Sequence, residues 1–466
     1  MEHSDHIANP SGPMAGPDQE ILAAIRWLDQ VDLASEPGIV ERSRHLLLDT
    51  IGCAIAGFRA RELQSLAARL NASEPGVVSL PGLVGGFSST AAAFLVGIAA
   101  CWDEACEGLE AAHGRPGLHA ISAAVPLALA KKSTLGDLLN AIVTGYEIGG
   151  RIGIAYRIRA GMHVDGTWGT FAATAAAGRL LGLRPDEIMG AIDTAACQLP
   201  FSLYHPITQG SRARNTYVGH SAAIALLLSA GAVDIPGLGG GLAVNTDLAL
   251  GRRLDSLVPA PPPGHWLVLD GYLKKYPAVR HVHFGIELGA RWHRERGPNT
   301  RRIRKIRMSI YREAMTYCGN RAPRHAIQAQ FSLSYGLAYA LRCGTLTPEA
   351  YSVESLADEE TQRLEKLVVI EDDPILSSMN RRGAELHIED GEGWSCRIAN
   401  VPGDSNHPLN RVELVSKFTG LTVPLIGLKA SNQIANRILD GPLDQPFDPS
   451  APAIPNHYDK SKATHL

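Results

Sequence analysis

The first half of the chain is dominated by helical segments built from small residues, and this feature constrains the fold most. The stretch Thr167–Gly182, TWGTFAATAAAGRLLG, consists mainly of Ala, Gly and Thr and stops at a glycine, as many helices do. Aromatic residues make up only 6% of the sequence. Small side chains let helix backbones approach closely, so we expect a tightly packed, mostly α architecture.

Other segments of the first half share this helical character. Ile21, Ile25 and Leu28 recur at helical spacing, and Asp165 and Thr167 are candidates for capping the helix that follows them. The same kind of reasoning predicts helices over 19–57, 88–102, 121–150, 186–197 and 222–230.

The composition changes near residue 265, where a Pro-rich stretch, PAPPPG (259–264), interrupts the helical pattern. Beyond it, alternating or β-branched residues predict three strands, at 302–309, 367–371 and 384–388, with a helix over 328–342 between them and another helix over 410–421. We therefore expect a mostly α protein with a large helical domain (19–264, rejoined by 401–466) and a smaller α+β domain (265–400). Residues 1–18 are expected to be a disordered lead-in.

Charge and cysteine content exclude several classes of protein. The net charge of −3 gives no basic surface for nucleic acid, and no apolar run approaches the ~20 residues of a membrane span. The seven cysteines are scattered without a CxxC pair, which argues against structural zinc and iron–sulfur clusters. We expect a cytoplasmic protein with free thiols, no metal site, no nucleic-acid partner and no membrane partner.

Five segments, in order along the chain, resemble the MmgE/PrpD family of 2-methylcitrate dehydratase, cis-aconitate decarboxylase and iminodisuccinate epimerase. They are LLLDTIGCAIAG (46–57), GMHVDGTWGTFAATAAAGRLLGL (161–183), LKKYPAVRHVHFGIE (273–287), AQFSLSYGLAYAL (329–341) and PGDSNHPLNRVELVSKF (402–418). The resemblance implies a large helical domain assembled from both chain ends, a small α+β domain and a homodimer.

The function implied is that of a lyase without a cofactor, acting on a small di- or tricarboxylic acid. Among the family's activities, dehydration of 2-methylcitrate is the one expected first. Decarboxylation of a cis-aconitate-like acid and epimerisation of an α-substituted dicarboxylate are alternatives that use similar groups. An alternative outside the enzymes is a non-catalytic relative that only binds carboxylates. Each enzymatic reading needs groups that transfer protons and cations that hold carboxylates.

Matches to the family's motifs select the candidate catalytic residues. His163 precedes the predicted helix at 167, whose positive end favours an anion and a neutral imidazole. Lys274 lies in Leu273–Pro277 (LKKYP), where the proline fixes the chain and aims the lysine into a cleft. Asp103 and Glu107 are four residues apart, a spacing that would place both carboxylates on one helical face. The expected catalytic set is His163, Asp103, His119, Lys274 and Tyr317.

At two positions this sequence differs from the family's pattern. Arg115 aligns where the family has a catalytic-type histidine, with His119 four residues later, and Arg214 aligns with the usual lysine. Arginine holds a carboxylate with two bonds but does not release its proton, whereas lysine does. We therefore predict that substrate is bound by Arg115, Arg214, Glu107 and His283.

Overall fold

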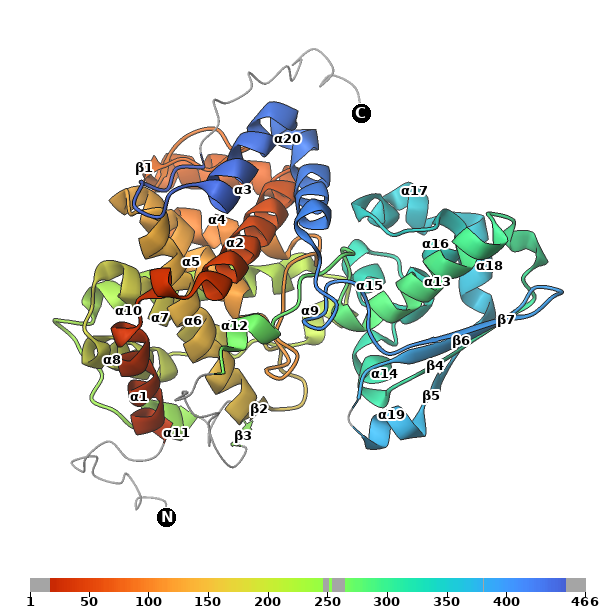
Figure 1. Ribbon diagram of the computed structural model, residues 1–466, viewed down its shortest axis with the longest axis horizontal. Helices are drawn as coiled ribbons and strands as arrows, with labels where there is room; N and C mark the ends of the chain where they lie inside the picture. The colour runs from red at the N-terminus through yellow and green to blue at the C-terminus, as the bar shows by residue number, and fades with distance from the viewer. Residues whose placement is uncertain (1–16, 246–250, 254–264, 380, 450–466) are drawn as a thin grey trace, which may run out of the picture.

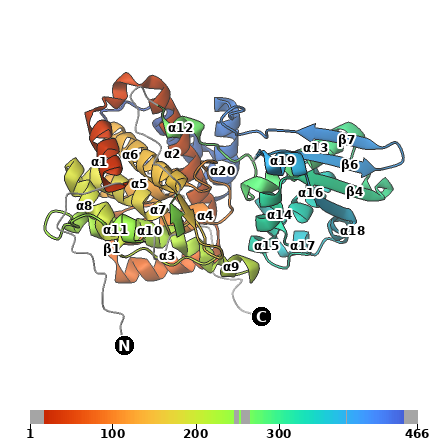
Figure 2. The same cartoon turned by 90° about the horizontal axis from the view of Figure 1, so that it is seen from below.

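The computed structural model describes residues 17–245, 251–253, 265–379 and 381–449. Its elements form a large helical part and, beside it, a smaller part that combines helices with a four-stranded sheet (Figures 1 and 2). The mostly α fold with a smaller α+β part is therefore confirmed. Residues 1–16 of the predicted lead-in and the predicted boundary at 264 lie outside the described residues, and the first helix already begins at Pro17.

The helical part is built mainly from the first 245 residues. Its helices are α1 (Pro17–Gln30), α2 (Pro37–Gly57), α3 (Arg61–Ser73), α4 (Ser89–Cys101), α5 (Pro116–Lys131), α6 (Leu135–Ala155), α7 (Gly169–Leu181), α8 (Pro185–Ala196), α9 (His205–Thr208), α10 (Thr216–Gly231), α11 (Gly241–Asn245) and α12 (Leu267–Asp270), joined by α20 (Arg411–Asp440). Three short strands, β1 (Pro75–Val78), β2 (Tyr156–Ile158) and β3 (Gly251–Arg253), lie outside the region where strands were predicted, and β2 pairs antiparallel with β3.

Small residues let these helices pack with their backbones close together, as expected from composition. A Cβ on Gly149 of α6 would lie 2.4 Å from the Cβ of Ala172 on α7. Likewise, a Cβ on Gly97 of α4 would lie 2.6 Å from the backbone nitrogen of Gly219 on α10. Both distances are shorter than van der Waals contact, so larger side chains at these glycines would force the helices apart.

The last helix of the chain returns to the first part of the fold. α20 lies against α2, where Phe418 fills the space beside Gly52 (Figure 1). Its Lys417 donates to the buried Asp49 of α2 at 2.5 Å and to the carbonyl of Ala105 at 2.7 Å. The helical part is therefore formed from both ends of the chain.

The α+β part has a mixed sheet of order β5-β4-β6-β7, in which β4 runs parallel to β5 and antiparallel to β6. Its strands are β4 (Lys305–Ile310), β5 (Val368–Asp372), β6 (Ala384–Glu389) and β7 (Trp394–Ile398), and its helices are α13 (His283–Arg296), α14 (Arg312–Cys318), α15 (Ala326–Gln330), α16 (Leu333–Cys343), α17 (Val353–Leu356), α18 (Glu359–Leu367) and α19 (Pro374–Ser378).

The three predicted strands correspond to β4, β5 and β6, whereas β7 was not predicted. No residue of this edge strand is fully buried, so its hydrophobic pattern is weak. The helix predicted over 328–342 is divided into α15 and α16, because Ser332 caps the start of α16. The predicted caps of α7 were wrong: the helix begins at Gly169, and no side chain caps it.

Throughout the described ranges, no helix combines the length and the hydropathy that crossing a bilayer requires.

One buried carboxyl belongs to the packing of the helical part. Glu107 is fully buried at the start of α5, where its Oε1 accepts the backbone N–H of Leu118 at 2.8 Å. Its Oε2 has no hydrogen-bond partner. Burial raises the pKa of Glu107 to about 8, so the folded protein holds this group mainly as the neutral acid at neutral pH.

We expect Glu107→Gln to stabilise the protein at pH 7.5 relative to the wild type, and to do so much less at pH 5. The unfolded carboxyl ionises near 4.5, so the unfolded state alone loses a proton between pH 4.5 and about 8. The wild type's free energy of unfolding therefore falls as pH rises through that window, and the glutamine variant avoids the loss. Urea unfolding at both pH values measures this, and an equal difference at the two would contradict it.

Candidate active site

A cavity of about 580 Å³ opens between the helical part and the α+β part. Both parts supply its wall, so neither could form it alone. From the helical part come Glu104, His113, Arg115, His163, Asp165, Trp168, Tyr204 and Arg214, and from residues beyond α12 come Lys274, Arg280, His281, Glu313, Tyr317, Phe331 and Arg382.

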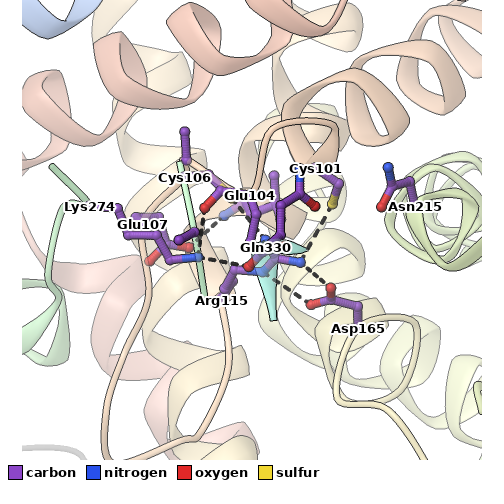
Figure 3. A network of polar contacts seen from close by, with 12 residues as sticks. Cys101, Glu104, Cys106, Glu107, Arg115, Asp165, Asn215, Lys274 and Gln330 are labelled. Carbon is purple, nitrogen blue, oxygen red and sulfur yellow. Dashed lines mark hydrogen bonds and ion pairs between the residues drawn. The ribbon is translucent and has the colours of Figure 1, made fainter. Parts of the chain in front are cut away.

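The carboxylate of Glu104 is the centre of a buried polar network (Figure 3). Three cations donate hydrogen bonds to it: Arg115 Nη1 at 3.2 Å, Arg214 Nη2 at 2.5 Å and Lys274 Nζ at 2.7 Å. Burial by itself raises the pKa of Glu104, but attraction to these cations outweighs it and holds the pKa well below its usual range. Glu104 is therefore ionised, with all three cations bound to it.

The backbone around Glu104 corrects the expectation of a helical face. α4 ends at Cys101, and Glu104 has a left-handed φ of 53°, so Asp103 and Glu107 do not lie on one helix. Asp103 does not line the cavity and pairs with Arg59 at 3.4 Å. This turn is held from both parts, because Gln330 of α15 donates to the Trp102 carbonyl at 3.1 Å and α20 binds its Ala105 carbonyl.

Asp165 is the second carboxylate of the network, on the other side of Arg115 (Figure 3). Arg115 donates to it through Nε at 3.3 Å and through Nη2, and Arg214 Nη2 lies 3.7 Å away. Burial raises the pKa of Asp165, but Arg115 is the chief of several cations that lower it well below its ordinary value. Three cations and two carboxylates leave the cluster with one excess positive charge (3 − 2).

His163 lies beside this cluster as a neutral imidazole. Burial lowers its pKa to about 3, although the nearby Asp165 carboxylate opposes that shift. The backbone N–H of Asp165 donates to Nδ1 at 3.0 Å, and the N–H of Arg214 Nε points at Nε2 from 3.5 Å, at the limit of hydrogen bonding. A neutral ring accepts at one nitrogen only, and the shorter contact assigns the lone pair to Nδ1 and the proton to Nε2. His163 therefore presents a hydrogen-bond donor at Nε2.

His119 lies behind the cavity wall rather than on it. Its Nδ1 donates to the carbonyl of Arg115 at 2.9 Å, and its Nε2 accepts the N–H of Gly166 at 3.4 Å. With both nitrogens bound to backbone, the ring connects the start of α5 to the loop that carries Asp165. In this position it supports the network and does not reach a ligand in the cavity.

The remaining predicted residues divide between the cavity and the core. Tyr317 lies on the cavity wall as a residue that is 43% exposed, and its ring stacks on His281. His283 is fully buried and donates to the Ala278 carbonyl at 3.1 Å. Of the nine predicted site residues, five line the cavity: Arg115, His163, Arg214, Lys274 and Tyr317. The other four do not: Asp103, Glu107, His119 and His283.

Glu104, Asp165 and Arg382 were missed as site residues. Glu104 is adjacent to Asp103 in the acidic stretch, and Asp165 is two residues after His163. Their closeness in sequence to predicted site residues could have identified both as candidates. Arg382 lies in a loop that contains none of the family motifs, so its place on the cavity wall is visible only in the folded structure.

Within the portion of the chain that the structure describes, no group of three or more His, Cys, Asp or Glu side chains is arranged to hold a metal ion. The seven cysteines are unpaired in the structure.

Comparison with known proteins agrees with this architecture. The model of the MmgE/PrpD N-terminal domain matches residues 23–232, and that of the MmgE/PrpD C-terminal domain matches residues 276–441. A cis-aconitate decarboxylase of Aspergillus terreus (strain NIH 2624 / FGSC A1156) is 27% identical over 363 residues, which cover 71% of this chain and 73% of that protein.

A cis-aconitate decarboxylase-like protein, oryM, of Aspergillus oryzae is 30% identical over 200 residues, 39% of this chain. That alignment spans only 41% of the relative's own length. The two family models nevertheless match in order and cover both the helical part and the α+β part. The chain belongs to the MmgE/PrpD family.

Proposed function

We propose that this protein is a lyase that acts on a small di- or tricarboxylic acid without a cofactor, and that it decarboxylates a cis-aconitate-like acid. The observation that carries the proposal is the buried cluster around Glu104, which has excess positive charge and one cation able to release a proton. The similarity to cis-aconitate decarboxylases supports the same substrate class.

Lys274 is the proton donor in this proposal. Its Nζ donates to the Glu104 carboxylate at 2.7 Å and to the Glu104 carbonyl at 3.0 Å. An ammonium has three N–H groups, and Nζ makes no other hydrogen bond within the described residues, so one remains for a ligand in the cavity. The guanidinium groups of Arg115 and Arg214 keep their protons, which leaves Lys274 as the acid of the cluster.

Neither the carboxylates of the Glu104 cluster nor the adjacent His163 are available as a base, and this favours decarboxylation over the dehydration that the sequence suggested first. Glu104 and Asp165 are bound by cations, and the lone pair of His163 is occupied by a backbone N–H. Dehydration and epimerisation both require removal of a proton from carbon. Decarboxylation does not: the carbon–carboxylate bond breaks, CO₂ leaves, and its electron pair takes a proton from the Lys274 ammonium.

His163 would stabilise the reaction without transferring a proton. Its neutral ring can donate a hydrogen bond from Nε2 to a carboxylate on which negative charge accumulates as CO₂ leaves. Arg115 and Arg214 would keep Glu104 in place and supply positive potential. The homodimer implied by the family resemblance and the cytoplasmic location expected from the free thiols remain predictions.

We expect Lys274→Arg to lower turnover of cis-aconitate by roughly 10²–10⁴-fold, because arginine keeps the charge but does not release the proton. Binding should change little. Mass-detected turnover and calorimetric titration measure the two effects. Lys275→Arg is the matched control, since the Lys275 side chain is 41% exposed and pairs with Glu287 outside the cavity. Undiminished turnover in Lys274→Arg would show that another group supplies the proton.

Two substitutions of His163 separate hydrogen bonding from proton transfer. A glutamine amide still donates a hydrogen bond, so His163→Gln should keep at least about tenfold more turnover than His163→Ala. If the ring instead transferred a proton, both variants would lose activity alike, by roughly 10²–10⁴-fold. Steady-state rates of the two variants on cis-aconitate distinguish these outcomes.

We expect incubation with EDTA to leave turnover unchanged, because side-chain cations compensate the charge of the substrate's carboxylates in this proposal. The measurement is the initial rate before and after chelation and dialysis. Loss of activity that one particular divalent ion restores would contradict the proposed mechanism.

A further inference from the structure

Arg382 lies in the connection between α19 and β6, and it is a largely buried cation whose N–H groups donate no hydrogen bond to the described residues. Its side chain is only 11% exposed, and it lines the cavity. Among the described residues it donates no hydrogen bond, and its Nη1 is enclosed by protein with an ion-pair neighbour but no hydrogen-bond partner. By contrast, all three guanidinium nitrogens of Arg115 donate to neighbouring side chains.

Two carboxylates form ion pairs with Arg382 but accept no hydrogen bond from its guanidinium group. Glu110 Oε2 lies 3.3 Å from Nη1, and Glu313 Oε2 lies 3.8 Å from Nη2. Glu313 is fixed in turn by His113, whose Nδ1 is 2.8 Å from its other oxygen. Glu110 is 51% exposed and can turn toward solvent when another anion approaches the guanidinium.

This part of the wall is distinct from the Glu104 cluster. No hydrogen bond or ion pair connects Arg382, Glu110 or Glu313 to Glu104 or Asp165 in the parts of the chain described above. The cations of the Glu104 cluster donate hydrogen bonds to their carboxylates, whereas Arg382 has only ion-pair contacts with Glu110 and Glu313 and retains donors that a further acceptor can satisfy. Leaving such donors unpaired in a buried site is unfavourable, and a bidentate carboxylate would relieve the cost.

We propose that Arg382 binds a substrate carboxylate other than the one that leaves, and thereby selects acids that carry this additional carboxylate. The inference rests on the proposed function and extends it by assigning a specificity-determining residue in the α+β part. A substrate bound in this way would contact Lys274 with its reacting end and Arg382 with a remaining carboxylate.

Two non-reacting ligands test this assignment by calorimetric titration. Tricarballylate has three carboxylates, and 2-ethylsuccinate is the same molecule with one terminal carboxylate replaced by a methyl group. The wild type should bind tricarballylate roughly ten- to a hundredfold more tightly. In Arg382→Gln that preference should fall to about one, because the additional carboxylate has lost its partner.

Two further variants keep the test decisive. Arg382→Lys preserves the charge beside Glu110 and Glu313, so it should fold even if Arg382→Gln does not, and it should show a reduced preference because lysine lacks the guanidinium fork. Arg381→Gln removes the neighbouring exposed arginine and should leave the preference unchanged. Thermal unfolding without ligand verifies that each variant is folded.

The outcomes separate this inference from the proposed function. An undiminished preference in folded Arg382→Gln, or in Arg382→Lys if the former does not fold, would mean that Arg382 only connects the two parts of the protein. Equal binding of both ligands by the wild type, with cis-aconitate still turned over, would overturn the role of Arg382 alone. Absence of both binding and turnover in the wild type would overturn the proposed function and this inference with it.

Discussion

The structure of the cavity depends on one buried carboxylate, that of Glu104, and the three cations that it holds. Arg115 comes from the start of α5, Arg214 from a short 3-10 helix (Arg212–Asn215) before α10, and Lys274 from the segment that leads into the α+β part. A buried charge is costly unless it is paired, and loss of one partner leaves the others unbalanced. The same carboxylate therefore fixes the relative positions of three distant segments.

This arrangement bears on the two arginines that the family resemblance places at a histidine and a lysine position. They were expected to bind substrate, and both line the cavity, but their donors already have partners inside the protein. Arg115 donates to Glu104 and Asp165, and Arg214 donates to Glu104 and Asn215 and faces His163. Because guanidinium groups remain charged, they keep both carboxylates ionised, and in the proposed mechanism proton release is left to Lys274. Excess positive charge, rather than unoccupied arginine donors, makes this end of the cavity attractive to an anion.

Sequence patterns predicted the fold well because the buried side of a helix or strand places apolar residues at regular intervals along the sequence. β4, β5 and β6 were located within a few residues, whereas the half-exposed β7 left no signal. For the site, motifs located His163 and Lys274 on the cavity, but not the geometry between them. Glu104 was missed because a helix was assumed to continue past Cys101, and Arg382 because nothing near it in sequence indicates an anion.

The position of α20 has a consequence for how the protein is made. A ribosome releases α2 long before α20, and the whole α+β part is synthesised between them. Until the final helix emerges, the groove beside Gly52 lacks Phe418, and Asp49 lacks its Lys417 partner. The α+β part can therefore complete its core during synthesis, while the helical part exposes apolar surface to the end. Nascent chains of this protein should need protection from aggregation at the segment made first.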